Sequence, residues 1–445
     1  MAAIDTTAGL GVTVARGAPA YRRYVLSLLM LSYTFNLLDR QVLGILAEPI
    51  KLAFALADWQ LGVLTGVVFA LFYTALGLPI ARLADRGNRP LIIAVSMAVW
   101  SAFTVASGLV QNYAQLLVAR LGVGIGEAGG TAPAHSLISD YAPREKRASA
   151  IAFFSVGAPL GSLLGLALGG LVLDAYGWRA AFMMAGLPGL ALAGFIAFTI
   201  REPRRLPDFD AAAPGAQTIP LKQALREIAS KKSLLLITLG GGLISFVNYG
   251  QSAFYASFFF RNHGEALQSL ATGLNLGMAG FLGVALGLAT GVTGVVGILA
   301  GGWLTDHLAR HDLRHYITVK LVASLLRIPF ILGAMFADNV LLALVLLSGQ
   351  MLFMGVAGPG GFAAVQGLVQ PRTRATASAC YSFSLNLIGL GLGPLMIGAL
   401  SDSLAASLGA PDGLRWAIVL SSAVLVVASL ALWPARRWFK EDTVS

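Results

Sequence analysis

Five ionisable residues interrupt long apolar stretches of the sequence: Asp39, Arg40, Arg120, Glu127 and Arg327. A charge at the centre of a bilayer costs at least about 2.5–3.5 kcal/mol, so such side chains must face a protein interior and pair there. A carboxylate beside arginines can take up and release a proton, and the arginines can bind an anion. These residue types therefore predict a site for protons and a charged substrate inside a membrane.

The spacing of these residues pairs the charges. Arg120, Gly124 and Glu127 stand at i, i+4 and i+7, which places both charges on one face of a helix. Asp39 and Arg40 lie near the middle of another helix, so an ion pair between Arg40 and Glu127 is geometrically reasonable. Two interpretations stay open. The pair is either a structural lock between helices or a proton-coupling site, with Glu127 as the first proton carrier and Asp39 as the second.

Polar and aromatic residues complete the candidate substrate site. Besides Arg40, Arg120 and Glu127, we expect substrate contacts from six side chains: Tyr33, Asn36, Asn248, Tyr249, Gln251 and Tyr381. Three roles stay open for Arg327: a structural role, a side chain that reaches the membrane interface, and a role in function. A cavity lined in this way has one charged wall and one apolar wall. That asymmetry favours an amphiphile with an anionic head and an acyl tail over a sugar.

The composition requires a membrane to hold these residues. The chain has 445 residues, of which 57% are hydrophobic and 12% charged, and its mean hydropathy is +0.76. An average soluble domain is about 45–50% apolar and about 25% charged. The values exclude a soluble enzyme, a nucleic-acid-binding protein and a secreted disulfide scaffold. The single cysteine, Cys380, also excludes an internal disulfide.

Motifs for enzymatic chemistry are missing from the sequence. It contains no Walker-type phosphate loop and no His-Glu-x-x-His zinc motif. His307, His311 and His315 share a helix face but have no fourth ligand, so we expect no metal and no cofactor. The expected partners are protons, a small amphiphilic or lipid substrate and the surrounding membrane lipids, with no nucleic acid. We expect a monomer and no enzyme activity.

Apolar runs of about 20 residues, the length that crosses a bilayer, define the elements. They predict twelve transmembrane helices over 24–47, 59–82, 90–110, 114–139, 147–173, 179–200, 233–260, 280–305, 316–336, 339–363, 373–400 and 413–434. Most Lys and Arg residues, Lys320 among them, fall on one side of the membrane, and the opposite connections hold only Lys51, Arg179, Arg261 and Arg415. This bias predicts cytoplasmic termini.

The connections divide the chain into three parts. We expect a six-helix bundle over 1–200, a cytoplasmic linker with a short amphipathic helix over 201–232, and a second six-helix bundle over 233–445. The segment 81–85 with Arg89 matches the segment 302–306 with Arg310, which indicates a duplicated bundle. Parallel repeats of this kind place a substrate site between the halves, near the bilayer midplane.

The repeated loop carries a charged motif. Residues Ala81, Leu83, Ala84, Asp85, Arg86 and Arg89 match a pattern that runs Gly-x-Leu-small-Asp-Arg-x-Gly-Arg, with departures at Ala81 and Asn88. In this motif and its layout of six plus six helices, the chain resembles the major facilitator superfamily. The resemblance implies the major facilitator fold. It also implies a cytoplasmic gate, for which the candidates are Asp85, Arg89, Asp140, Asp306 and Arg310.

Three short segments are similar to the Spinster subfamily of these transporters. They are Asp39-Arg40, the Asp-Arg-x-Asn-Arg form of the loop motif, and the run from Arg120 to Ala128, in which glycines precede Glu127. Spinster proteins are associated with the transport of lysolipids and sphingolipid phosphates, so a lipid-like substrate is implied.

These patterns together predict a secondary active transporter in a bacterial inner membrane. It works by alternating access, is coupled to protons, and moves an amphiphilic lipid-like or organic substrate that is anionic or zwitterionic. Proton-driven multidrug export is the alternative, and an intramembrane enzyme is the less favoured one. The sequence leaves open the substrate, the direction of transport and the choice between symport and antiport.

Overall fold

Every regular element is helical in the computed structural model, which describes residues 19–143, 146–205, 221–370 and 373–442. The predicted all-helical class is confirmed for these ranges. Helices satisfy all backbone hydrogen bonds within one segment, which an apolar chain in lipid requires. The predicted linker lies partly outside the described residues, because 206–220 are not among them.

Nine helices of the described ranges are long and apolar enough to cross a membrane. Three differences separate this number from the twelve predicted spans. Polar residues interrupt α2 (Pro19–Phe54), the predicted span 114–139 is broken between α6 (Tyr113–Glu127) and α7 (Thr131–Tyr141), and the fifth and sixth spans join in α9 (Gly157–Thr199). Twelve crossings and cytoplasmic termini remain predictions.

A single glycine marks the boundary between the two predicted spans that join in α9. Gly177 has a φ of 81° and a ψ of 172° inside this otherwise helical run. A positive φ is strained for residues with a side chain, and glycine adopts it freely. The chain therefore bends at Gly177, within the gap that the sequence predicts between 173 and 179.

The described residues form two compact units by their internal packing. Unit 1 comprises those within Met1–Arg40, Phe72–Ser162 and Phe182–Gly215. Unit 2 comprises those within Gln41–Leu71, Leu163–Ala181 and Ala216–Ser445. The boundaries fall inside helices, so α2, α4 (Val68–Arg86) and α9 each contribute to both units. These packing units are not the two predicted halves of the chain, because the halves are defined by repeated sequence segments and the units by internal contacts.

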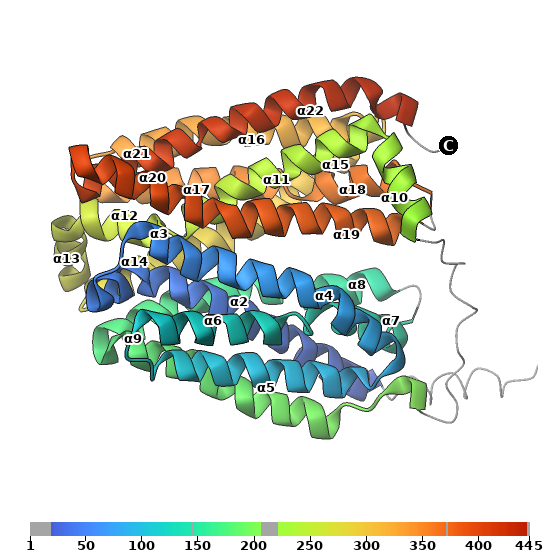
Figure 1. The fold of residues 1–445 in the computed structure, drawn as a ribbon, viewed down its shortest axis with the longest axis horizontal. Coiled ribbons are helices and arrows are strands. Elements are labelled where there is room, and N and C mark those ends of the chain that lie inside the picture. The colour runs from blue at the N-terminus through green and yellow to red at the C-terminus, as the bar shows by residue number, and fades with distance from the viewer. Residues whose placement is uncertain (1–18, 144–145, 206–220, 371–372, 443–445) are drawn as a thin grey trace, which may run out of the picture. The chain divides into compact units, whose positions relative to one another are not determined.

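Unit 1 is built around α2, α5 (Arg89–Ser107) and α6, with α7 and α8 (Arg147–Ser155) beside them. Within it, α5 packs along α6 and against α7 (Figure 1). Asn88 starts α5 by accepting a hydrogen bond from the backbone N–H of Leu91, and a proline follows at the start of the helix.

Unit 2 contains the remaining helices. In it, α11 packs against α20 and α22, and α16 against α17 and α22 (Figure 1). The helices are α3 (Asp58–Gly62), α10 (Leu221–Ser230), α11 (Lys232–Ser252), α12 (Tyr255–Asn262), α13 (Gly264–Gly273), α14 (Met278–Leu288), α15 (Gly294–Ala309), α16 (His315–Phe336), α17 (Val340–Val356), α18 (Pro359–Gly367), α19 (Arg374–Ser384), α20 (Gly393–Leu408), α21 (Ala410–Ser421) and α22 (Ala423–Asp442). Wider π-helical turns over Val63–Val67, Ala289–Thr293 and Leu385–Leu392 join neighbouring helices.

Candidate functional site

A buried cluster of four charges lies in unit 1, on α2 and α6. The Arg40 Nε atom donates to Glu127 Oε2 at 2.6 Å, and Arg120 Nη1 pairs with Asp39 Oδ2 at 3.0 Å. Glu127 is completely buried, and the Arg40 side chain retains 20% of its exposure. The structure therefore brings together the four charges that the sequence places in the first half. It also forms the expected contact between Arg40 and Glu127.

The two carboxylates of this cluster differ in how they are satisfied. Thr104 Oγ1 donates to Asp39 Oδ1 at 2.5 Å, so both oxygens of Asp39 have partners. Glu127 binds Arg40 through Oε2, whereas its buried Oε1 has no hydrogen-bond partner among the described residues. Glu127 thus keeps one oxygen available for a proton, and Asp39 does not. The sequence gives no signal for Thr104, because a lone threonine is common in apolar helices.

Close packing of α5 against α6 brings Thr104 to the cluster. A Cβ atom on Gly126 would come within 2.5 Å of the Trp100 backbone nitrogen, so the α5 backbone can approach only a glycine here. Thr104 follows Trp100 by one turn and also donates to its carbonyl oxygen at 2.9 Å. The glycines that precede Glu127 therefore serve the site by allowing this approach.

The predicted residues of α2 lie beside the cluster. Asn36 is buried, and Tyr33 stacks on Phe154 with ring centroids 4.7 Å apart. Both line a small cavity in unit 1. The Arg40 guanidinium lies 4.9 Å from the centre of the Tyr73 ring, a cation–π contact that the sequence did not predict.

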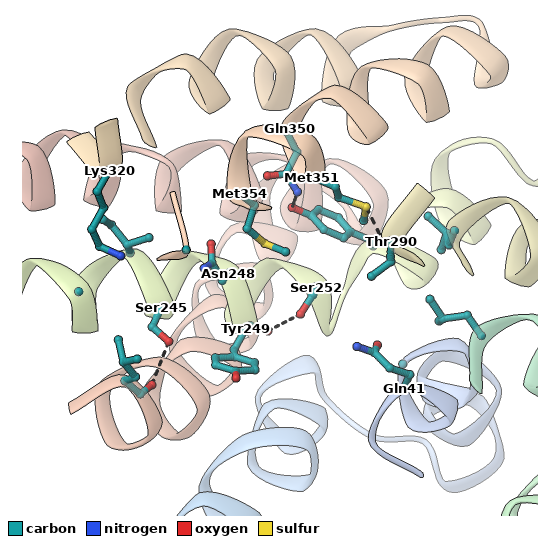
Figure 2. A pocket seen from close by; sticks show the side chains of 18 of the residues that line it. Gln41, Ser245, Asn248, Tyr249, Ser252, Thr290, Lys320, Gln350, Met351 and Met354 are labelled. Atoms are coloured by element: carbon teal, nitrogen blue, oxygen red, sulfur yellow. Dashed lines mark hydrogen bonds between the residues drawn. The ribbon is translucent and has the colours of Figure 1, made fainter. Parts of the chain in front are cut away.

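A separate cavity of about 340 Å³ lies within unit 2. Asn248, Tyr249 and Tyr381, three of the predicted substrate contacts, line it together with Met351 and Met354 (Figure 2). Lys320 lines it too, and this side chain is only 6% exposed. The charge pattern places Lys320 with the cytoplasmic charges, although the residue lies within the predicted span 316–336. In the structure it lies in the second turn of α16, and its side chain is buried.

Gln251 lies behind the wall of this cavity and does not line it. Its amide nitrogen donates to the Ile418 carbonyl oxygen at 3.0 Å, and its Oε1 accepts from Tyr255 Oη at 2.9 Å. Tyr255 Oη also accepts from Gln350 Nε2 at 3.0 Å. These bonds use both ends of the Gln251 amide, so the structure gives this predicted substrate contact a packing role.

Arg327 is fully buried at the end of the same hydrogen-bond chain. Its Nε donates to Gln350 Oε1 at 3.0 Å, while Nη1 and Nη2 have no partner. The expectation that Arg327 reaches the membrane interface is therefore wrong. No carboxylate within the described residues pairs with it, so unit 2 holds a buried cation beside the cavity wall.

The predicted gate residue Arg89 is fully buried in unit 1. Its Nη1 pairs with Asp140 at 2.6 Å, as expected, and its Nε donates to Glu202 Oε2 at 3.1 Å. Glu202 also accepts from the Arg89 backbone N–H at 2.8 Å. The sequence missed Glu202 because it directly follows the last predicted helix of the first half, where a charged residue normally faces water.

The other predicted gate residues are not brought together. Asp306 and Arg310 are exposed, and neither forms an ion pair with a described residue. The side chain of Asp85 lies outside the described part of the chain. The repeat places Asp306 at the end of α15. Among the described residues, however, Arg310 forms no ion pair equivalent to the one between Arg89 and Asp140.

A second charged cluster in unit 2 was also missed. It is named here the Arg261 cluster and comprises Glu48, Lys51, Asp58, Arg261 and Ser401. Arg261 pairs with Glu48 at 2.7 Å and with Asp58 at 2.8 Å, and Lys51 Nζ donates to Asp58 at 2.5 Å. Ser401 Oγ donates to the same carboxylate at 2.6 Å. These residues lie at or beyond the ends of predicted spans, where charges carry little signal.

The profile of the Major Facilitator Superfamily matches residues 29–314 of the chain. The chain belongs to the Major Facilitator Superfamily. The sequence-based prediction of this superfamily is confirmed. Its members are multi-pass membrane transporters, so the protein is a transporter and not an enzyme.

Individual relatives narrow the similarity within the superfamily. An MFS-type efflux pump of Mycolicibacterium smegmatis is 33% identical over 430 residues, which cover 96% of each chain. The sphingosine-1-phosphate transporter SPNS2 of Danio rerio is 26% identical and covers 92% of this chain and 82% of its own. A crystal structure of a bacterial homologue of the human lysosomal transporter Spinster, inward-facing and unoccupied, has a TM-score of 0.83 at 30% identity. It covers 96% of this chain and 100% of its own. The predicted resemblance to Spinster is confirmed.

Proposed function

We propose that this superfamily member is a proton-coupled secondary transporter of an amphiphilic, lipid-like anion or zwitterion. It works by alternating access in a bacterial inner membrane, with both termini in the cytoplasm. The observation that carries the proposal is the buried pair of Arg40 and Glu127, in which Glu127 Oε1 has no hydrogen-bond partner in the part of the chain that the structure describes. The bacterial and Spinster relatives support the membrane and the substrate class.

Glu127 carries the coupled proton in this proposal. A buried carboxylate stays ionised only while a cation compensates it, and Arg40 is that cation. An anionic substrate that binds Arg40 removes the compensation and favours protonation of Glu127, so substrate and proton bind together. A cationic substrate would compete with the proton instead. Asp39 is the second candidate, but its oxygens are already engaged by Arg120 and Thr104.

The gate is a further part of the proposal. Arg89 with Asp140 forms its first half, to which we add Glu202, and Asp85 is assigned to it from the motif. Asp306 and Arg310 form the repeated half in another state of the transport cycle. The two bundles over 1–200 and 233–445, joined by the linker over 201–232, are the proposed moving parts.

Proton-driven multidrug export is the alternative function. It is favoured by one observation, the 33% identity to an MFS-type efflux pump over nearly the whole chain. A transporter of organic cations would be expected to present a carboxylate without a cation beside it. In unit 1, by contrast, each buried carboxylate of the cluster is paired with an arginine.

Transport by purified protein in proteoliposomes tests the proposal. The substrates are lysophospholipids, sphingoid phosphates and organic cations, each with and without a pH gradient. We expect the gradient to drive accumulation of the anionic or zwitterionic lipids. Glu127→Gln should abolish this accumulation but keep exchange of substrate down its own gradient, because the amide imitates a permanently protonated carboxyl.

The matched control is Glu265→Gln, which removes an exposed glutamate on α13 and should leave transport unchanged. Full pH-driven transport by Glu127→Gln would move the proton site elsewhere. Accumulation of organic cations alone would favour the drug exporter.

A further inference from the structure

The cavity of unit 2 holds a buried lysine without a counter-ion. Lys320 is 6% exposed, and its Nζ atom donates to the Ala357 carbonyl oxygen at 3.2 Å. No carboxylate of the described residues forms an ion pair with it, and none lines the cavity in that part of the chain. An ammonium group out of water is costly unless an anion compensates it. The uncompensated charge points to an anion that comes from outside the chain.

Tyr381 directs a second donor to the same place. A Cβ atom on Gly361 would lie 3.3 Å from Lys320 Nζ and would also collide with Tyr381 Oη. The ammonium and the phenol therefore converge on the spot that a glycine keeps open. The Tyr381 ring packs edge-on against Phe362, with centroids 5.0 Å apart. Its hydroxyl forms no hydrogen bond with a described residue, so it is free to donate.

The rest of the cavity separates polar from apolar surface. Figure 2 shows Lys320 reaching toward the side of α11 that carries Asn248, while Met351 and Met354 come from α17. Asn248 Oδ1 is buried without a hydrogen-bond partner. Arg327 stands seven residues after Lys320, on the same side of α16, and adds a second buried cation behind Gln350. The volume of about 340 Å³ is in the range of small-molecule sites, which begin at about 300 Å³.

We infer that Lys320 and Tyr381 bind the phosphate group of a single-chain phospholipid in this cavity, whose methionine-lined part receives the first segment of the acyl chain. The inference rests on the proposed function, to which it adds the residues that bind the headgroup. It also differs from the expectation of one apolar wall, because Lys320 places a cation in the cavity of unit 2. Phosphate suits the site because it accepts hydrogen bonds from an ammonium and a hydroxyl at once.

Binding to the detergent-solubilised full chain, without a pH gradient, tests this inference. The probes are radiolabelled oleoyl lysophosphatidic acid, the neutral monooleoylglycerol, and inorganic phosphate as a competitor. Lys320→Met should weaken the affinity for the phosphate lipid at least tenfold, the loss expected for a charge-assisted hydrogen bond. It should change the affinity for the neutral lipid less than twofold. Lys320→Arg keeps the charge and should retain most of the affinity, and Lys222→Met, on the exposed side of α10, is the matched control.

Structural effects are separated by two further measurements. The thermal stability of lipid-free Lys320→Met should equal or exceed that of the wild type, because a buried unpaired charge is removed. Tyr381→Phe, which removes only the hydroxyl, should weaken the affinity for the phosphate lipid about two- to tenfold. This variant replaces Lys320→Met in the test if Lys320→Met does not fold. Equal losses for both lipids, or an unchanged affinity for the phosphate lipid, would overturn the inference. Competition by inorganic phosphate at the affinity of the lipid would show a free-phosphate site instead.

The outcomes for the two proposals can be told apart. Lipid binding that depends on Lys320, without any transport driven by a pH gradient, would refute proton coupling and keep the phosphate site. Transport that is driven by the pH gradient and is unchanged in Lys320→Met would refute the phosphate site and keep proton coupling.

Discussion

Replacing Arg40 with Ala should destabilise the protein more than replacing Arg40 and Glu127 together. Loss of one partner of a buried ion pair costs about 3–5 kcal/mol, because the other charge is left in a low dielectric. Arg40 keeps 20% of its side-chain exposure, so we take the lower end, about 3 kcal/mol, or roughly a hundredfold in the ratio of folded to unfolded protein. Arg120 is already paired with Asp39, through Nη1 at 3.0 Å.

The double variant Arg40→Ala/Glu127→Gln removes the stranded charge and should lose only about 1 kcal/mol of packing, about 2 kcal/mol less than Arg40→Ala alone. Unfolding in detergent with increasing denaturant, followed by tryptophan fluorescence, measures these differences. The control is Arg23→Ala, an exposed arginine of the same helix, which should change stability by less than about 0.5 kcal/mol. If the two single losses simply add within about 0.5 kcal/mol, Arg40 and Glu127 are not a direct pair and the reasoning fails.

Two other sites give independent expectations. Arg89→Ala should lower the free energy of unfolding by about 3–5 kcal/mol, because Glu202 loses its buried partner. The double variant Arg89→Met/Glu202→Gln should recover most of this loss. A loss below about 1 kcal/mol for Arg89→Ala would contradict the buried pair. Burial lowers the pKa of His263 below its usual 6.5, and Arg415 lowers it further, so the folded state binds fewer protons than the unfolded state. The free energy of unfolding should therefore fall as the pH drops below about 6.5. His263→Phe should make this fall smaller between about pH 7 and pH 5. An unchanged dependence of the free energy of unfolding on pH in the variant would assign it to other groups.

The charged cluster of the first half could be predicted because placing a charge inside a membrane costs free energy. A carboxylate and an arginine within an apolar run must face each other, so the spacing of Arg120 and Glu127 was enough to expect a pair with α2. The spacing also predicted Arg40 as the partner of Glu127, but not the contacts of Asp39. Those depend on how closely α5 approaches α6 at Gly126, which brings Thr104 to Asp39.

Residues near helix ends were predicted less well, for a physical reason. A lysine or glutamate within one or two turns of a helix end can reach water or stay inside, and hydropathy does not distinguish the two. Both Lys320 and Glu202 are buried, because Lys320 donates to the Ala357 carbonyl oxygen and Glu202 pairs with Arg89. The number of crossings is sensitive to the same effect, since Gly129 and Gly130 break one predicted span and polar residues interrupt α2.

The Arg261 cluster sets an order for the biosynthesis of the protein. Asp58 precedes Arg261 by 203 residues and Ser401 by 343 residues, so it is made and placed in the membrane long before these partners exist. Until then, only Lys51 compensates its charge. A nascent chain that stops in the middle of the molecule therefore carries an incompletely paired acid pair, Glu48 and Asp58, within its early helices. The cluster is therefore completed only after the second half of the chain has been made.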